Sequence, residues 1–270
     1  MEIFKTIILG IVEGITEWLP VSSTGHLILV NEWVNLDASQ EFINTFNVVI
    51  QLGAIIAVIV FFFNKLNPLD PHKTAVERTK TWNIWMKVII AVIPSAVIGL
   101  LFDDMIEAKF FNPITVASML IIYGIIMIIL ENGNHKPKVN DFEQLSIPRA
   151  IGVGLFQCLA LIPGTSRSAA TIIGGVYLGT SRYIATEFSF FLAIPTMFGA
   201  SALKLVKNGM AFSGFEWMIL GIGSLVSFIV SMVAIKFLMD YIKKHDFKVF
   251  GYYRIVLGIA VLLYFLVFSQ

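Results

Sequence analysis

Long apolar stretches are the feature that most constrains how this chain can fold. Six of them are long enough to be membrane spans, because a helix of about 20 apolar residues crosses about 30 Å of hydrocarbon. Hydrophobic residues make up 57% of the sequence and charged residues 14%, whereas a soluble domain is roughly half apolar and about a quarter charged. The sequence therefore predicts an all-α integral membrane protein in a lipid bilayer. The six expected transmembrane helices cover approximately residues 43–63, 84–102, 113–130, 186–206, 217–239 and 253–268.

Charge and motifs exclude several other classes of protein. The formal net charge is +1, so we expect no acidic partner such as a nucleic acid. Cys158 is the single cysteine, which excludes an internal disulfide framework. The sequence lacks glycine-rich nucleotide-binding motifs and the cysteine–histidine spacing of a zinc site. Any chemistry must therefore come from polar residues placed in apolar surroundings.

Two further apolar segments, 1–36 and 148–180, are each broken near the middle. The first is interrupted by LPVSSTGH at 19–26 and the second by IPGTSRS at 162–168. Non-helical backbone at membrane depth persists only where protein or a water-filled cavity satisfies its polar groups. We therefore predict two re-entrant helical hairpins that surround a site.

The two broken segments occupy corresponding places in the two halves of the chain. The motif PVSS at 20–23 aligns with PGTS at 163–166, 143 residues later, and three spans follow each hairpin. An odd number of crossings per half reverses the orientation of the second half, as in an inverted repeat with its site between the halves. We predict repeats at 1–134 and 148–270 joined by a cytoplasmic linker at 135–147.

Loop charges predict the orientation in the membrane. Lysine and arginine concentrate in the loops 64–83, 131–148 and 240–252. Cytoplasmic loops carry the excess of positive charge, so these three loops are expected inside and both termini outside. The first hairpin then enters from the outer face, and the active site is predicted to open to that side.

Charged residues in the first hairpin need an explanation. Glu13 and Glu17 are four residues apart and share one helix face, and one ionisable group in the membrane core costs about 3 kcal/mol. They could be hydrogen-bonding residues that stabilise the hairpin, or they could hold a cation, a proton or an arginine. His26 follows the break, where a carboxylate could orient it as a base or nucleophile, although a lone histidine is more often structural.

The second hairpin supplies a positive charge. Arg167 lies in PGTSRSAAT, where hydroxyl residues open an apolar helix. A helix N-terminus suits an anion, and the arginine fork matches phosphate oxygens. Arg167 could instead only neutralise Glu13 or Glu17, but that leaves the hydroxyl residues unexplained. The combined set favours phosphoryl transfer on a lipid that carries a pyrophosphate.

These motifs resemble those of a known family. EGITEWLPVSSTGHL resembles the (E/Q)xxxE region, and PGTSRSAAT the PGxSRSxxT motif, of the undecaprenyl pyrophosphate phosphatases of the BacA/UppP type. The resemblance implies a multi-pass hydrolase of the bacterial inner membrane that removes the terminal phosphate of undecaprenyl pyrophosphate. It also implies recycling of the lipid carrier for cell-wall (peptidoglycan) synthesis, bacitracin resistance, a divalent cation (Mg²⁺ or Ca²⁺) and a possible homodimer.

The resemblance also implies roles for residues. The required residues of the family fall on Glu17, Ser23, His26 and Arg167, with Glu13 as the first acid, and the two glutamates are expected to bind the metal or act as acid and base. Either His26 or Ser23 attacks the phosphorus, with His26 as base in the second case, or one of them activates a water. Further residues expected to bind the substrate are Ser22, Thr24, Gly164, Thr165, Ser166, Ser168 and Thr171.

A transporter is the alternative function. Inverted repeats with broken helices are typical of secondary transporters, in which glutamate, histidine and arginine couple transport to protons. A lipid flippase on this scaffold, with or without hydrolysis, is the sharper form of that hypothesis.

Overall fold

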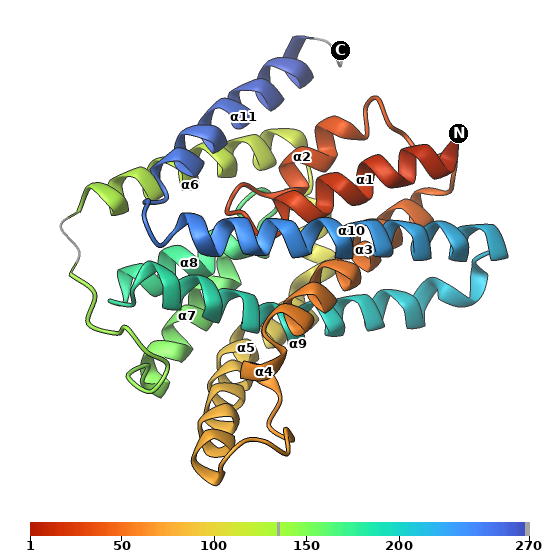
Figure 1. Cartoon of the computed structure of the whole chain (residues 1–270). Helices are drawn as coiled ribbons and strands as arrows, with labels where there is room; N and C mark the ends of the chain where they lie inside the picture. Colours follow the sequence, from red (N-terminus) through yellow and green to blue (C-terminus); the bar gives the residue numbers. More distant parts are fainter. Residues whose placement is uncertain (134–135, 268–270) are drawn as a thin grey trace.

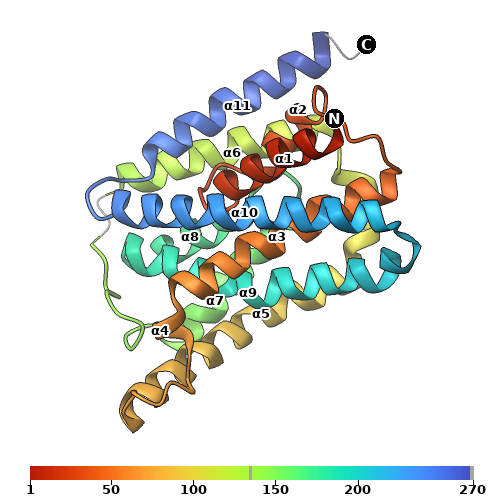
Figure 2. The same cartoon turned by 45° about the vertical axis from the view of Figure 1, so that its right-hand side comes forward.

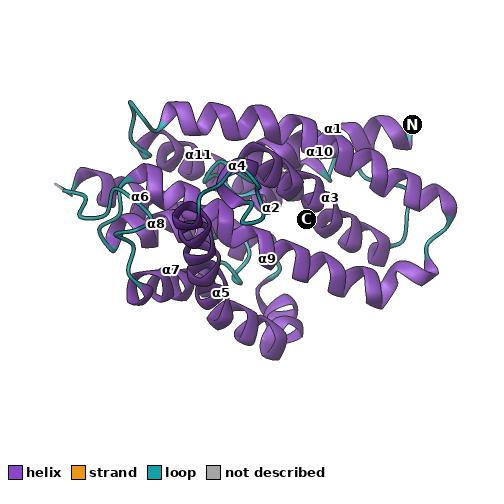
Figure 3. Cartoon of the chain, turned by 60° about the horizontal axis from the view of Figure 1, so that its bottom comes forward, coloured by secondary structure: helices purple, strands orange, loops and turns teal. Residues whose placement is uncertain are grey.

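The protein is built from helices (Figures 1 and 3). The structure is a computed structural model that describes residues 1–133 and 136–267. Within those ranges six helices are long and apolar enough to cross a membrane, which confirms the predicted spans. They are α3 (Gln40–Phe61), α5 (Ala75–Phe110), α6 (Pro113–Asn132), α9 (Arg182–Asn208), α10 (Gly214–Tyr241) and α11 (Lys248–Val267).

The two broken segments form pairs of shorter helices. The first pair is α1 (Glu2–Thr16) and α2 (Ser23–Val30), and the second is α7 (Ile147–Leu159) and α8 (Arg167–Tyr177). At about 1.5 Å per residue, none of these four helices reaches across about 30 Å of hydrocarbon. These lengths agree with re-entrant hairpins, which stay a prediction. The remaining elements are α4 (Phe63–Leu66) and a 3₁₀ turn at Gly209–Ala211.

Both hairpins turn on a serine in an unusual backbone conformation. Ser22 has a φ of 73° and Ser166 a φ of 70°, a region that non-glycine residues rarely occupy. Each side chain accepts a hydrogen bond from the backbone N–H three residues later and so caps the helix that follows, α2 or α8. Such strain persists where the surrounding structure enforces it, most often at functional sites.

The packing of the two hairpins corresponds as well. Helix α1 packs against α10 as α7 packs against α5, while α6 contacts α11 and α3 contacts α9. Gly10 and Gly154 permit the two equivalent crossings: a Cβ would lie 2.9 Å from the Gly223 carbonyl oxygen in the first and 1.9 Å from that of Ala91 in the second. The inverted repeat stays a prediction with which these contacts agree.

The structure changes the register of the predicted alignment by one residue. The sequence motifs, taken from their prolines, pair Ser22 with Thr165 at an offset of 143. The two helix caps are instead Ser22 and Ser166, and Gly10 corresponds to Gly154, both at an offset of 144. Backbone geometry, rather than the proline, therefore sets the correspondence.

The three loops rich in lysine and arginine lie at one end of the molecule (Figure 2). Lys80 pairs with Glu143, which connects the start of α5 to the segment before α7. Glu131 at the end of α6 accepts hydrogen bonds from the Arg182 side chain and from the Phe247 backbone N–H. These contacts join the connections that were expected to share one side of the membrane.

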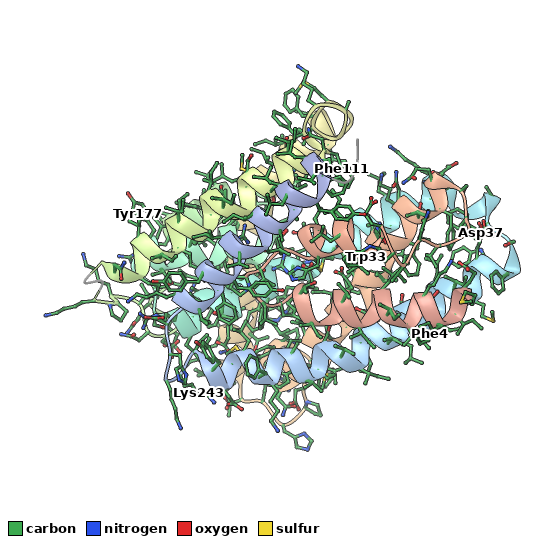
Figure 4. The ribbon with its side chains drawn as sticks, turned by 90° about the horizontal axis from the view of Figure 1, so that it is seen from above. Phe4, Trp33, Asp37, Phe111, Tyr177 and Lys243 are labelled. Atoms are coloured by element: carbon green, nitrogen blue, oxygen red, sulfur yellow. The ribbon has the colours of Figure 1, made fainter. Side chains whose placement is uncertain are left out.

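The opposite end carries the start of α1 and the connection from α2 to α3 (Figure 4). In the view from above, Phe4 and Asp37 lie at one end, and Tyr177 and Lys243 lie at the other (Figure 4). The Asp37 backbone N–H donates to the Glu2 carboxylate, so the start of α1 is held against the connection from α2 to α3. The tips of both hairpins lie between these ends, where α2 and α8 each contact α6.

Candidate active site

An ion pair between the two hairpins forms the centre of the site. Arg167, the first residue of α8, donates from Nη2 to Oε1 of Glu17, directly after α1, at 2.9 Å. Only 12% of the Arg167 side chain and 8% of the Glu17 side chain is exposed. The guanidinium also donates to the Ser189 carbonyl at 2.8 Å and lies 5.4 Å from the centre of the Trp18 ring. The pair is therefore oriented from several sides in a poorly solvated place.

Ser23 joins the same carboxylate. Its Oγ donates to Oε2 of Glu17 at 2.9 Å, so the two carboxylate oxygens hold Ser23 and Arg167 separately. Ser23 is the first residue of α2, because the Ser22 side chain caps that helix. The structure thus brings together three of the expected residues, with a hydroxyl nucleophile in direct contact with a carboxylate.

The tip of the second hairpin is tightly packed. Gly164 has a φ of +90°, and a Cβ there would lie 2.4 Å from the Val116 carbonyl oxygen, so this position requires glycine. Ser166 caps α8, and its Oγ lies 3.1 Å from that of Ser168. The first-turn N–H groups of α8 therefore stand beside Arg167, as an anion site needs.

Two of the expected substrate-binding hydroxyls have partners within the protein. Ser168 Oγ donates to the Leu19 carbonyl at 3.3 Å, which ties the second hairpin to the first. Thr171 Oγ1 bonds Ser189 Oγ at 2.6 Å and the Arg167 carbonyl at 2.8 Å. In this structure these hydroxyls therefore brace the site around Arg167.

Glu13 lies fully buried next to the ion pair. Its carboxyl interacts electrostatically with Glu17 and Arg167. The Glu17 carboxyl lies within hydrogen-bonding reach, but neither Glu13 oxygen has a partner with good hydrogen-bond geometry among the described residues, although a buried carboxyl left unpaired is costly. Glu13 is therefore a polar group available to something that binds in the site.

His26 points away from this cluster. Its Nδ1 lies 2.7 Å from the Ser22 carbonyl oxygen, and its Nε2 lies 2.7 Å from the hydroxyl of Tyr253 on α11. His26 therefore makes no hydrogen bond to Ser23, which bonds Glu17 instead. Thr24 lies between Ser23 and His26 on the first turn of α2.

The family model described as "Bacitracin resistance protein BacA" matches residues 6–260. The chain belongs to the BacA family. It is 68% identical over 265 residues to undecaprenyl-diphosphatase 1 of Clostridioides difficile, covering 98% of this chain and 97% of the relative. It is 56% identical to the undecaprenyl-diphosphatase of Enterococcus faecalis, covering 99% of each chain. The corresponding protein of Desulfitobacterium hafniense is 58% identical, with 98% and 96% covered.

This BacA-family chain has a second buried arginine that the sequence analysis missed. Arg254 on α11 is fully buried and donates to carbonyl oxygens of both hairpin tips. The acceptors are Pro20 at 3.2 Å and both Gly164 and Thr165 at 2.9 Å. Thr165 itself is fully buried. The sequence did contain an indication of this contact. Arg254 lies within the apolar stretch 253–268, and an arginine is costly in a membrane unless it has partners.

Ser189 on α9 was missed as well, and little in the sequence could have revealed it. It accepts hydrogen bonds from Arg167 and Thr171 and so orients the guanidinium. Serines within apolar membrane helices often serve only to pack one helix against another, so the residue type alone does not indicate a site. Its role depends on α9 lying against α8, which only the folded chain defines.

A divalent cation in this BacA-family site would have to use Glu13 and Glu17. Among residues 1–133 and 136–267, no group of three or more histidine, cysteine, aspartate or glutamate side chains could hold a metal. Mg²⁺ is commonly bound by one or two carboxylates plus substrate phosphates, whereas Ca²⁺ takes about six to eight oxygens. The unpaired oxygens of Glu13 beside Glu17 therefore fit Mg²⁺ held jointly with a phosphate.

Proposed function

We propose that this chain hydrolyses undecaprenyl pyrophosphate to undecaprenyl phosphate and inorganic phosphate. The observation that carries the proposal is the buried contact of Arg167 and Ser23 with the two oxygens of Glu17. The relatives named undecaprenyl-diphosphatase support the same reaction. In a bacterial inner membrane this activity recycles the lipid carrier for cell-wall synthesis and gives bacitracin resistance.

The proposed phosphate site lies between the two helix N-termini. Arg167 and the N–H groups at the start of α8 bind phosphate oxygens, since both present donors and positive charge. Ser166 and the first turn of α2 (Ser22, Thr24) complete the cradle around the pyrophosphate. A bound phosphate competes with Glu17 for Arg167 and thereby frees the carboxylate that contacts Ser23.

The reaction exchanges one bond to the terminal phosphorus for another. A nucleophile attacks that phosphorus, the bond to the bridging oxygen breaks, and undecaprenyl phosphate leaves with the electron pair. Where the nucleophile is a side chain, water then cleaves the phosphoenzyme and releases inorganic phosphate. Ser23 Oγ, deprotonated by Glu17, and His26 Nε2 are the two candidates. Acid treatment separates them, because phosphohistidine is acid-labile and phosphoserine is stable.

Glu13 and Glu17 are the residues that would hold a divalent cation. Bound there, the ion would neutralise charge on the phosphate oxygens. Glu13 is suited to this because its oxygens have no other partner among the described residues. Within the protein itself, Glu17 orients Ser23 and Arg167 whether or not an ion is present.

We further propose that the site joins two inverted repeats, 1–134 and 148–270, with a cytoplasmic linker at 135–147, and that it opens to the outer face. The corresponding helix contacts support the repeats, and the clustered basic loops support the orientation. Residues 134–135 and 268–270 of these ranges lie outside the described residues. The resemblance also implies a homodimer, which the molecular mass measured in detergent would test.

The test is phosphate release from undecaprenyl pyrophosphate by purified protein in detergent, where no gradient exists. We expect release by the wild type and by Glu41→Gln, a control at an exposed carboxylate. Glu17→Gln should lose at least about 100-fold, because the base or its charge is removed. Release that persists in Glu17→Gln would contradict the site. The absence of release from folded wild type, with and without Mg²⁺, would favour the transporter hypothesis.

A further inference from the structure

The imidazole of His26 has two defined partners. Nδ1 lies 2.7 Å from the carbonyl oxygen of Ser22. A carbonyl oxygen only accepts hydrogen bonds, so Nδ1 must carry a proton. In the neutral ring Nε2 is then the nitrogen with the free electron pair, and it is the one atom of His26 that can act as a base or nucleophile.

Tyr253 covers that nitrogen. Its hydroxyl lies 2.7 Å from Nε2 and donates to it when the ring is neutral. The two rings lie nearly parallel, with an angle of 11° and centroids 5.5 Å apart. The reactive nitrogen is therefore occupied by a phenol from α11, and the ring is held in one orientation by bonds at both nitrogens.

The backbone around Tyr253 is fixed relative to the site. The next residue, Arg254, is fully buried and bonded to the tips of both hairpins. Gly251 and Gly258 allow α11 to pack closely on α6, where added Cβ atoms would lie 2.9 Å and 2.8 Å from backbone carbonyl oxygens. Tyr253 as a whole residue is 48% exposed and so retains room to turn away from His26.

We propose that Tyr253 is a positioning residue that fixes the tautomer and orientation of His26 and covers Nε2 until the site is used. The proposal rests on the proposed function in that His26 takes part in phosphate release. Among the described residues, no hydrogen bond or ring contact joins Tyr253 to Glu17, Ser23 or Arg167, whereas both join it to His26, so it acts through His26. A simple packing contact would use the ring and would not need the hydroxyl.

Tyr253→Phe separates these two roles, because it keeps the ring and removes the hydroxyl. Tyr252→Phe is the matched control, since the neighbouring tyrosine is also exposed, and in the described part of the chain the hydroxyl that bonds His26 is that of Tyr253. The probe is diethyl pyrocarbonate, which acylates the unprotonated imidazole nitrogen, and mass spectrometry of the peptide that contains His26 measures the rate. His72 and His245 serve as internal references within each protein.

We expect His26 to be modified about fivefold faster in Tyr253→Phe, the factor expected for the loss of one hydrogen bond. Tyr252→Phe should match the wild type, and the reference histidines should react equally in all three. Equal rates at His26 in wild type and Tyr253→Phe would overturn the proposal. His72 and His245 are exposed and report only the reagent concentration, so thermal unfolding of the three proteins in detergent is the measurement that identifies any general loosening.

Phosphate release gives a second readout. With a smaller fraction of His26 correctly oriented, Tyr253→Phe should lower kcat by about fivefold to tenfold and leave KM within about twofold. A rise in KM alone would mean that Tyr253 binds substrate, and this would contradict the positioning role. The two proposals can fail separately. If His26 reacts more slowly in the wild type than in Tyr253→Phe but the wild type releases no phosphate, the contact between Tyr253 and His26 is supported and the proposed function is refuted.

Discussion

The two hairpins share a backbone design but carry different chemistry. Both turn on a serine with positive φ that caps the following helix. Corresponding positions, 144 residues apart, hold Glu13 and Gln157, and Ser23 and Arg167. The first hairpin therefore supplies the acid and the hydroxyl, and the second supplies the cation. Two segments of similar backbone geometry thus bring complementary groups to one point without sharing the groups themselves.

The pair Glu13 and Gln157 makes the difference concrete. Gln157 is buried and its amide donates to Ser95 Oγ at 2.6 Å, so it helps to bind α7 to α5. Glu13 is equally buried and makes no hydrogen bond of this kind: neither of its oxygens has a partner of good geometry among the described residues, which also holds for Oε1 of Gln157. The same position along the two hairpins therefore contributes to helix packing in the case of Gln157 and to the candidate site in the case of Glu13.

The largest expected effect on activity is that of Arg167→Ala, which removes the positive charge that the second hairpin contributes. Removal of the guanidinium that pairs with Glu17 should lower kcat/KM at least about 1,000-fold, since phosphate charge is then left unpaired. Arg167→Lys keeps the charge but loses the fork, and should recover only part of the activity. Phosphate release measures both variants. Activity in Arg167→Ala near that of the wild type would mean that the second hairpin does not bind the phosphate.

Gly164→Ala tests whether the tip of the second hairpin tolerates any side chain. Both the positive φ and the clash with the Val116 carbonyl should lower the free energy of unfolding by about 3 kcal/mol. Gly179→Ala is the matched control, because φ there is +89° but the nearest atom to an added Cβ is 3.8 Å away. It should lose only about 1 kcal/mol. Unfolding in mild detergent measures both variants. Equal losses of unfolding free energy in Gly164→Ala and Gly179→Ala would mean that the close contact with Val116 does not contribute.

Glu13→Gln and Gln157→Glu exchange the side chains between the hairpins. Glu13→Gln keeps the size of the side chain and can still donate to the Glu17 carboxylate, so the protein should fold normally while kcat falls about tenfold and the response to added Mg²⁺ weakens. Gln157→Glu should lower stability and leave the Mg²⁺ response unchanged, because its position faces Ser95. The Mg²⁺ dependence of phosphate release checks both. An unchanged dependence in Glu13→Gln would exclude Glu13 as a metal ligand.

Much of the fold could be predicted because its causes are local in the sequence. Continuous apolar stretches identified all six spans, and the interruptions at 19–26 and 162–168 identified the two short helix pairs. A contact of Arg167 with Glu13 or Glu17 was the alternative that the sequence analysis weighed against phosphate binding, because either charge alone is costly in a membrane. These signals need no knowledge of how distant helices pack.

Other features depend on three-dimensional contacts and could not be predicted. The one-residue change of register follows from where each serine adopts positive φ, which the position of the prolines does not reveal. The turn of His26 toward Tyr253 depends on α11 lying beside α2. Likewise, the hydrogen bonds of Ser168 and Thr171 within the protein could not be predicted, because their acceptors, Leu19 and Ser189, come from other segments. Binding of the substrate by these two hydroxyls stays a prediction.

The contact between Glu17 and Arg167 has a consequence for turnover. Because the carboxylate and a phosphate group compete for the same guanidinium, the protein contains its own competitor for anions. This competition weakens the binding of every phosphate, including the inorganic phosphate left after cleavage. As that product leaves, Glu17 can take its place on Arg167, so the empty site neutralises itself and does not retain the anion it has just made.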